Sequence, residues 1–348
     1  MTLPRRYLLV GALLLICASD ASVSQEKCTA IAQYSNYNIS YNFVPRMIKA
    51  LAVYQPCEAE DLRCLYHAQT MTKNLEPYVS RGITPQMMTQ SKWLGTLYQI
   101  VRGRIYRQEN CSNPKRCADV DDLLLDIEGD LPDLEMVVNV CDWPQVHFLS
   151  GLSGPVFSYS TTVSHLYIMY PAWSFWTTAG PILQHYARAE KIPWDAKQIK
   201  AFFRGSRSSP KCDNLGRLSL RCPELVDDQY TAGHPMEADP AEEVSLVEHC
   251  QYKSLPWVHY VPVASDAYVE QLAGLMLFLR EHGDLAEEIP DRGHQFVWLH
   301  LRMEDVQCHW RRLLQEYAKS LTYKVHIEPG FLQVSNKRAL QLYRGLNI

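Results

Sequence analysis

The stretch Leu134-Glu135-Met136-Val137-Val138-Asn139-Val140-Cys141-Asp142-Trp143-Pro144 carries the strongest fold signal of this 348-residue chain. Its first seven residues are mostly apolar and rich in Val, and turn-forming residues follow at once. This pattern is typical of a strand that is buried on both faces and ends in a loop. In an open α/β sheet, ligands sit at the carboxyl ends of the strands. The stretch therefore predicts an α/β fold with Asp142 at a ligand-binding edge.

The sequence on both sides continues the alternation of strands and helices. Thr84-Pro85 is a good N-cap and first-turn pair for a short helix, and Arg102-Gly103 interrupts residues 97–106 as the turn of a hairpin would. Further strands are expected at residues 155–160, 201–203 and 257–263, and helices at residues 44–54, 119–127, 267–281 and 301–317. Such alternation indicates α/β architecture, and the length favours two domains.

A second polar segment follows the strand expected at residues 201–203. Arg204-Gly205-Ser206-Arg207 combines two guanidinium groups, a glycine and a hydroxyl, a set that can hold a diphosphate. A solvated turn is an equally good interpretation of the same residues. For Asp142, a role as general base competes with the commoner role of Asp as a turn-former or helix cap.

The N-terminus and the cysteines indicate the secretory pathway. Arg5-Arg6, an apolar run over residues 7–18 and small residues at 19–22 follow the order of a signal peptide, and the run is shorter than the roughly 18 residues of a spanning helix. Ten of the 11 cysteines would remain after cleavage, and disulfides are expected. The short spacings Cys57 to Cys64 and Cys111 to Cys117 suit local disulfides. A net charge of −4 without a basic run argues against nucleic acid as a partner.

Six blocks, in this order, resemble the signature blocks of the Rumi-type protein O-glucosyltransferases. They are residues 131–140, Asp142-Trp143-Pro144-Gln145, residues 170–176, Phe203-Arg204-Gly205-Ser206-Arg207, residues 246–253 and residues 256–260. The resemblance covers nearly all of the expected mature chain. It implies a GT-B-like glycosyltransferase fold with two Rossmann-like α/β domains, the second shortened. The expected organisation is a signal peptide at 1–21, an acceptor-side domain at 22–190, a donor-side domain at 191–300, and C-terminal helices at 301–348 that pack back on the first domain.

The resemblance also implies a reaction and its residues. The family transfers glucose, or alternatively xylose, from the UDP-sugar to a Ser of EGF-like repeats in proteins such as Notch, with inversion and without a metal or other cofactor. Asp142 is implied as the catalytic base. The resemblance implies that Arg204, Ser206 and Arg207 bind the donor. It also implies that the acceptor groove is formed by Trp173, Trp176, Gly180 and Pro181, although ordinary core packing is an equally good interpretation of the two tryptophans. Residence in the endoplasmic reticulum lumen is implied, or secretion, because the last residues are not a KDEL-like signal.

The chain departs from the family pattern at several places. Between Lys253 and Pro256 the family carries a few dozen more residues that grip the nucleotide, whereas this chain runs straight through. Cys141 and Cys212 stand where the family has Arg. Cys250 and Cys308 would each lose the usual partner, and the alternatives are that they pair with each other or form a zinc site with the neighbouring histidines. The second hypothesis for the function is therefore a catalytically inactive binder of EGF-like domains.

Overall fold

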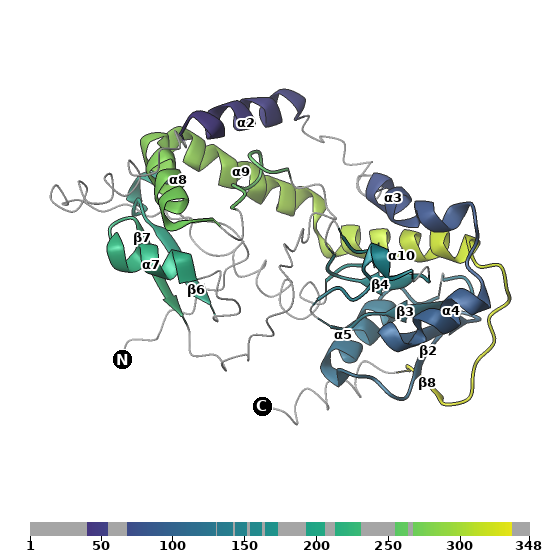
Figure 1. The fold of residues 1–348 in the computed structure, drawn as a ribbon. Helices are drawn as coiled ribbons and strands as arrows, with labels where there is room; N and C mark the ends of the chain where they lie inside the picture. The colour runs from purple at the N-terminus through teal and green to yellow at the C-terminus, as the bar shows by residue number, and fades with distance from the viewer. Residues whose placement is uncertain are drawn as a thin grey trace. The chain divides into compact units, whose positions relative to one another are not determined.

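The computed structural model describes ten stretches of the chain, residues 40–54, 68–129, 131–141, 143–151, 154–161, 164–172, 193–205, 213–230, 255–263 and 267–335. The chain divides into two compact units. Unit 1 comprises Met1–Pro56, Glu190–Glu243 and Ser254–Trp298, and unit 2 comprises Cys57–Ala189, Val244–Lys253 and Leu299–Ile348. Strands and helices alternate in both units, which confirms the predicted α/β class (Figure 1).

The described elements follow one another along the chain in this order: α2 (Ser40–Val53), α3 (Ala68–Val79), α4 (Pro85–Ser91), the 3-10 helix η2 (Lys92–Leu94), β1 (Thr96–Val101), β2 (Arg104–Gln108), α5 (Pro114–Leu125), β3 (Leu134–Val138), η3 (Phe148–Ser150), β4 (Val156–Ser158), β5 (Ile168–Met169), η5 (Trp194–Ala196), β6 (Ala201–Gly205), α7 (Asp213–Arg221), β7 (Val226–Tyr230), α8 (Val269–Glu281), α9 (Gly283–His300), α10 (Met303–Lys319) and β8 (Phe331–Gln333). None of these helices is both long enough and apolar enough to span a bilayer.

Unit 2 is built on a six-stranded mixed sheet with the order β5-β4-β3-β1-β2-β8. The three strands β3, β4 and β5 run parallel, and the remaining pairs are antiparallel. Strands β1 and β2 form the predicted hairpin, whose two turn residues Arg102 and Gly103 have φ values of 52° and 71°. Positive φ at both central residues is what a two-residue turn between twisted strands requires. The backbone N–H of Arg102 donates to Asp133 Oδ1 at 2.6 Å and links the turn to the residue before β3.

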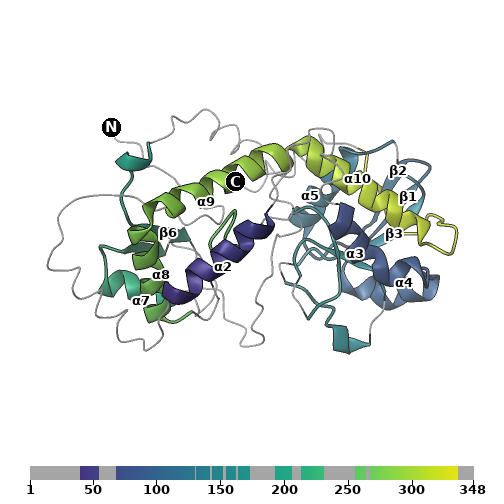
Figure 2. The same cartoon turned by 90° about the horizontal axis from the view of Figure 1, so that it is seen from above.

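The predicted central strand is confirmed as β3, and all five of its residues are buried. Helix α10 packs against α3 and β3, and Figures 1 and 2 show α3 and α10 side by side. Helix α10 buries its apolar side chains in the core, and its Trp310 and Tyr317 are in edge-to-face contact with Phe157 on β4. The Tyr317 hydroxyl also donates to the Glu135 carbonyl at 2.8 Å. The C-terminal helix thus closes the core over the middle of the sheet.

A second close contact holds β3 at its carboxyl end. Gly95, just before β1, lies so near this strand that a Cβ placed on it would come within 2.3 Å of the Val138 carbonyl oxygen and 2.9 Å of the Asn139 nitrogen. Its φ of −178° is extended and open to any residue. Glycine is therefore required here, because the backbone of residue 95 packs against the backbone at the end of β3 and leaves no room for a Cβ.

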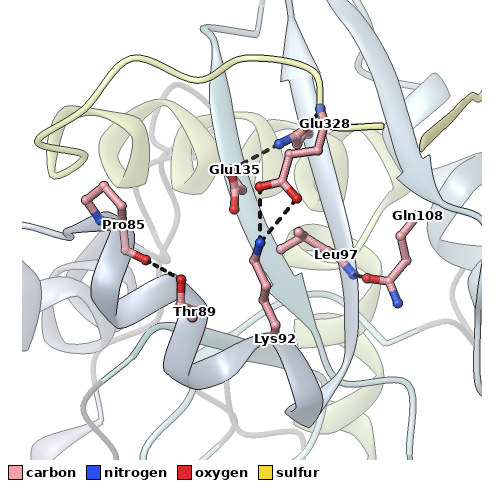
Figure 3. A network of polar contacts seen from close by, with 8 residues as sticks. Pro85, Thr89, Lys92, Leu97, Gln108, Glu135 and Glu328 are labelled. Carbon is pink, nitrogen blue, oxygen red and sulfur yellow. Dashed lines mark hydrogen bonds and ion pairs between the residues drawn. The ribbon is translucent and has the colours of Figure 1, made fainter. Parts of the chain in front are cut away.

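The segment after α10 returns to the sheet through polar contacts (Figure 3). Lys92 Nζ lies 3.1 Å from Glu328 Oε1, and the Glu328 backbone N–H donates to Gln99 Oε1 at 3.2 Å. The Gln99 amide in turn donates to Glu135 Oε2 at 3.1 Å. Burial raises the pKa of the Glu135 carboxyl, and its hydrogen bond with Gln99 acts in the opposite direction. These contacts lead into β8, which pairs with β2 at the edge of the sheet.

Unit 1 contains the parallel pair β6 and β7, and α7 packs on β7 and on α8. Its core gathers side chains of α8 with Ala201 and Val226 from the two strands. Phe43 of α2 contacts Phe278 of α8 and Trp257. The predicted helix at residues 267–281 is confirmed as α8.

The strand predicted at residues 257–263 is wrong. Trp257 has a φ of 68°, its backbone N–H donates to the Tyr260 carbonyl, and only an isolated bridge joins Pro256 to Tyr260. His259 Nδ1 accepts the Leu255 N–H at 2.8 Å. Such local hydrogen bonds between side chain and backbone compete with a strand ladder, so the apolar sequence forms a turn.

The predicted disulfide between Cys111 and Cys117 is present at the start of α5. Cys222 and Cys308 each take part in a disulfide, so of the alternatives left open for Cys308 the structure favours a disulfide. The predicted pair of Cys57 and Cys64 lies outside the described residues, as does Cys250.

Candidate active site

The carboxyl end of β3 is organised around the side chain of Asn139, which is fully buried. Asn139 Oδ1 accepts the backbone N–H of Cys141 at 2.9 Å and the side-chain amide of Gln145 at 3.2 Å. Asn139 Nδ2 donates to the Trp143 carbonyl at 3.1 Å and to Ser158 Oγ at 3.3 Å. An Asn amide has two donor hydrogens and two acceptor lone pairs. All four are used here, so the loop that leaves β3 is fastened to β4.

A tyrosine hydroxyl fastens the far side of the same loop. The backbone N–H groups of Gln145 and Val146 both donate to Tyr167 Oη, the second at 2.7 Å. Burial raises the pKa of Tyr167 to about 12, while the two backbone hydrogen bonds act in the opposite direction. The hydroxyl therefore stays neutral at physiological pH. The loop is held at both ends by buried polar groups.

Beyond this loop, two segments of unit 2 run together and present apolar side chains to solvent. The Leu166 N–H donates to the Val146 carbonyl, the Phe148 N–H donates to the Ser164 carbonyl, and His147 and His165 form a bridge. The large exposed apolar side chains of this region are Trp143, Phe148, Leu149 and Leu166. Exposed apolar side chains that gather beside a polar site are typical of a protein-binding surface.

Arg204 lies at the end of β6 in unit 1, and its guanidinium is engaged with the neighbouring strand. Nη2 lies 2.9 Å from Asp227 Oδ2, and Nη1 donates to the carbonyls of Phe203 and Asp227. The guanidinium carbon also lies 4.1 Å from the centre of the Phe202 ring. Arg204 thus ties β6 to β7 at the point where the predicted donor segment begins.

The structure does not describe most of the residues predicted for the site. These residues are Asp142, Trp173, Trp176, Gly180, Pro181, Ser206 and Arg207. Their roles stay predictions. Within the described stretches, no group of three or more His, Cys, Asp or Glu side chains could hold a metal ion.

No role was predicted from the sequence for four residues that shape this edge, namely Asn139, Gln145, Ser158 and Tyr167. A local signal existed for one of them. Asn139 accepts the N–H two residues further on, which is the Asx-turn that Asn often forms after a strand. Ser158 and Tyr167 reach the loop through tertiary contacts, for which local sequence gives no signal.

Comparison with known proteins places the chain in a family. The model of Glycosyl transferase family 90 matches residues 59–255 and 252–346. The chain is 36% identical over 383 residues to "O-glucosyltransferase rumi" of Drosophila pseudoobscura pseudoobscura, covering 92% of each protein. It is 37% identical over 382 residues to "O-glucosyltransferase rumi homolog" of Aedes aegypti, covering 91% of this chain and 94% of the relative. It is 34% identical over 357 residues to "Protein O-glucosyltransferase 1" of Homo sapiens, covering 85% of this chain and 90% of the relative.

The comparisons also concern the place after Lys253 where the chain departs from the family sequence pattern. The two matched segments meet at residues 252–255, where the sequence was expected to lack part of the family pattern. The alignment to the Drosophila pseudoobscura pseudoobscura protein is longer than the 348 residues of the chain, so it includes positions that have no counterpart here. The match otherwise extends over most of the sequence. The chain belongs to glycosyl transferase family 90.

Proposed function

We propose that this chain is an inverting protein O-glucosyltransferase that transfers glucose, or alternatively xylose, from a UDP-sugar to a Ser hydroxyl of an EGF-like repeat such as those of Notch. The observation that carries the proposal is the match over 92% of the chain to a relative named as an O-glucosyltransferase. The fastened loop at the end of β3 supports it, because this loop carries the residue predicted as the base.

The proposed reaction is a single displacement. The acceptor Ser oxygen forms a bond to the anomeric carbon as the bond from that carbon to the UDP oxygen breaks, and UDP leaves with the electron pair. Asp142 takes the Ser proton, as a general base must. Attack opposite the leaving group inverts the anomeric centre.

The charge that builds on the departing UDP needs fixed positive groups and N–H donors. In the proposal Ser206 and Arg207 provide them directly. Arg204 contributes by holding β6 against Asp227 on β7, the strand pair from which the donor segment continues. In the GT-B-like arrangement that we propose, unit 1 binds the donor and unit 2 binds the acceptor. No metal ion or other cofactor enters this reaction.

The acceptor in this proposal is a small folded domain rather than an extended peptide. Four exposed apolar side chains that lie in or beyond the loop after β3, Trp143, Phe148, Leu149 and Leu166, suit the surface of such a domain. Trp173, Trp176, Gly180 and Pro181 would extend the same acceptor groove. The disulfide-bonded cysteines, of which Cys111 and Cys117 are a defined pair, favour an oxidising compartment. We therefore propose the endoplasmic reticulum lumen, or secretion, as the location.

Calorimetric titration tests the proposal with two ligands. The purified chain should bind UDP-glucose and, separately, a folded EGF-like domain that carries the Cys-x-Ser-x-Pro/Ala-Cys acceptor pattern. Binding of the EGF-like domain without UDP-glucose would identify a non-catalytic binder and overturn the proposal. Asp142→Asn should abolish transfer while leaving the affinity for the EGF-like domain nearly unchanged. Transfer that persists in this variant would rule out Asp142 as the base.

A further inference from the structure

We propose that Asn139 is a positioning residue that fixes the backbone on both sides of the base. The proposal rests on the proposed function, since it takes Asp142 as the base. A single planar amide contacts both sequence neighbours of residue 142: Oδ1 accepts from the Cys141 N–H, and Nδ2 donates to the Trp143 carbonyl. Because the amide is rigid, these two hydrogen bonds fix the distance between the peptide groups that flank the base.

The amide is itself held by groups that do not belong to the loop. The second acceptor of Nδ2 is Ser158 Oγ on β4, and the backbone N–H of Asn139 donates to the Phe157 carbonyl at 2.7 Å. The Tyr170 hydroxyl donates to the Asn139 carbonyl at 3.4 Å. The side chain of Asn139 has no exposed surface, so water cannot readily replace a lost partner. The core of the sheet therefore fixes the position of the loop through Asn139.

Only an amide of this length satisfies the geometry. Alanine would leave the Cys141 N–H and the Trp143 carbonyl without their partner. Aspartate would keep the two acceptor contacts of Oδ1 but would turn an acceptor oxygen toward the Trp143 carbonyl. It would also place a second carboxyl three residues from Asp142, and a like charge nearby raises the pKa of a carboxylate. The two substitutions thus have different expected signatures.

The rate of a displacement reaction is sensitive to small errors in the position of the catalytic group. A misplacement of a catalytic group by about 1 Å can lower the rate by roughly 100-fold without removing any substrate contact. Loss of Asn139 should therefore lower kcat much more than it changes KM. A purely structural role would lower the thermal midpoint without this selective loss.

The test compares Asn139→Ala and Asn139→Asp with Gln99→Ala in the full-length chain. Gln99 is a matched control, because it is a buried amide of the same sheet that bonds Glu135 and Glu328, away from the loop. Hydrogen–deuterium exchange should show the amide of Cys141 exchanging roughly tenfold faster in Asn139→Ala, as expected for the loss of one hydrogen bond. In Gln99→Ala this amide should exchange at the wild-type rate.

Kinetics with UDP-glucose and an EGF-like domain provide the second readout. Asn139→Ala should lower kcat by roughly 10- to 100-fold with both KM values within about twofold of wild type, and Asn139→Asp should move the acidic limb of the kcat–pH profile to higher pH. Unchanged exchange at Cys141 in Asn139→Ala would show that Asn139 does not hold the loop. A kcat loss no larger than that of Gln99→Ala would overturn the positioning role. If the wild-type chain transfers no sugar, the proposed function and the positioning role both fail, while the exchange result still decides whether Asn139 holds the loop.

Discussion

Replacement of Gly95 by Ala is expected to destabilise unit 2 at the carboxyl end of β3. The added Cβ would lie 2.3 Å from the Val138 carbonyl oxygen and 2.6 Å from its carbonyl carbon, whereas real Cβ contacts essentially never fall below 3.0 Å. The obstructing atoms are backbone and cannot rotate away, so the two chain segments must separate by several tenths of an ångström. Overpacking of this kind costs typically about 1–3 kcal/mol. We expect the upper end, because β3 is buried along its whole length.

Differential scanning calorimetry measures this effect. A loss of about 3 kcal/mol corresponds to a fall in Tm of about 6–12 °C for a unit of this size. Gly283→Ala is the matched control, because a Cβ there meets nothing within 4 Å at the first residue of α9. That variant should melt at or slightly above the wild-type temperature, since Ala favours a helix more than Gly does. A Gly95→Ala protein that melts with wild-type Tm would refute the close approach of Gly95 to β3.

Three further expectations concern side chains of unit 2. Burial raises the pKa of Asp121 to about 6, with Arg107 acting in the opposite direction. The folded state therefore holds a proton that the unfolded chain releases near pH 4, so the stability contributed by this group falls by about 3 kcal/mol as the pH rises from about 4 to 6. Urea unfolding should show that Asp121→Asn removes this part of the pH dependence of stability, and an unchanged pH profile in the variant would contradict the raised pKa. Tyr317→Phe leaves the Glu135 carbonyl without its hydroxyl donor and should cost about 1–2 kcal/mol in the same assay, while a neutral result would show that the hydrogen bond contributes nothing net. Replacing both Cys111 and Cys117 by Ser opens a short loop and should cost about 2 kcal/mol, measured against wild type under non-reducing conditions; equal stability would contradict a stabilising role for the disulfide.

The elements with strong local signals could be predicted from the sequence. The Val-rich run of β3, the Thr84-Pro85 cap of α4 and the Arg102-Gly103 turn each depend on residues close together in the chain. Thr84 Oγ1 accepts the Met87 N–H at 3.3 Å, as the cap requires. The short edge strand β8 was not predicted, because its three residues form a strand only by pairing with β2. Residues 257–263 look like a strand by composition alone, and hydrogen bonds within the segment decide otherwise.

The site shows the same division between local and tertiary information. The sequence indicated a polar loop after β3, and the structure confirms that a loop leaves the strand there. Arg204 was expected to face a diphosphate, and in the structure its guanidinium bonds Asp227, a partner 23 residues away in sequence. Asn139 was overlooked because an Asn after a strand is ordinary. Its significance appears only when Ser158 and Gln145 are seen to converge on it.

Sugar transfer by the purified wild-type chain tests the proposed O-glucosyltransferase activity most directly. A folded EGF-like domain with the acceptor Ser is incubated with UDP-glucose and with UDP-xylose in separate reactions, and intact-mass spectrometry records the product. We predict the addition of one sugar residue to the acceptor Ser, and no addition when this Ser is replaced by Ala. An EGF-like domain that binds the chain and is recovered unmodified with both donors would contradict the assignment as a transferase.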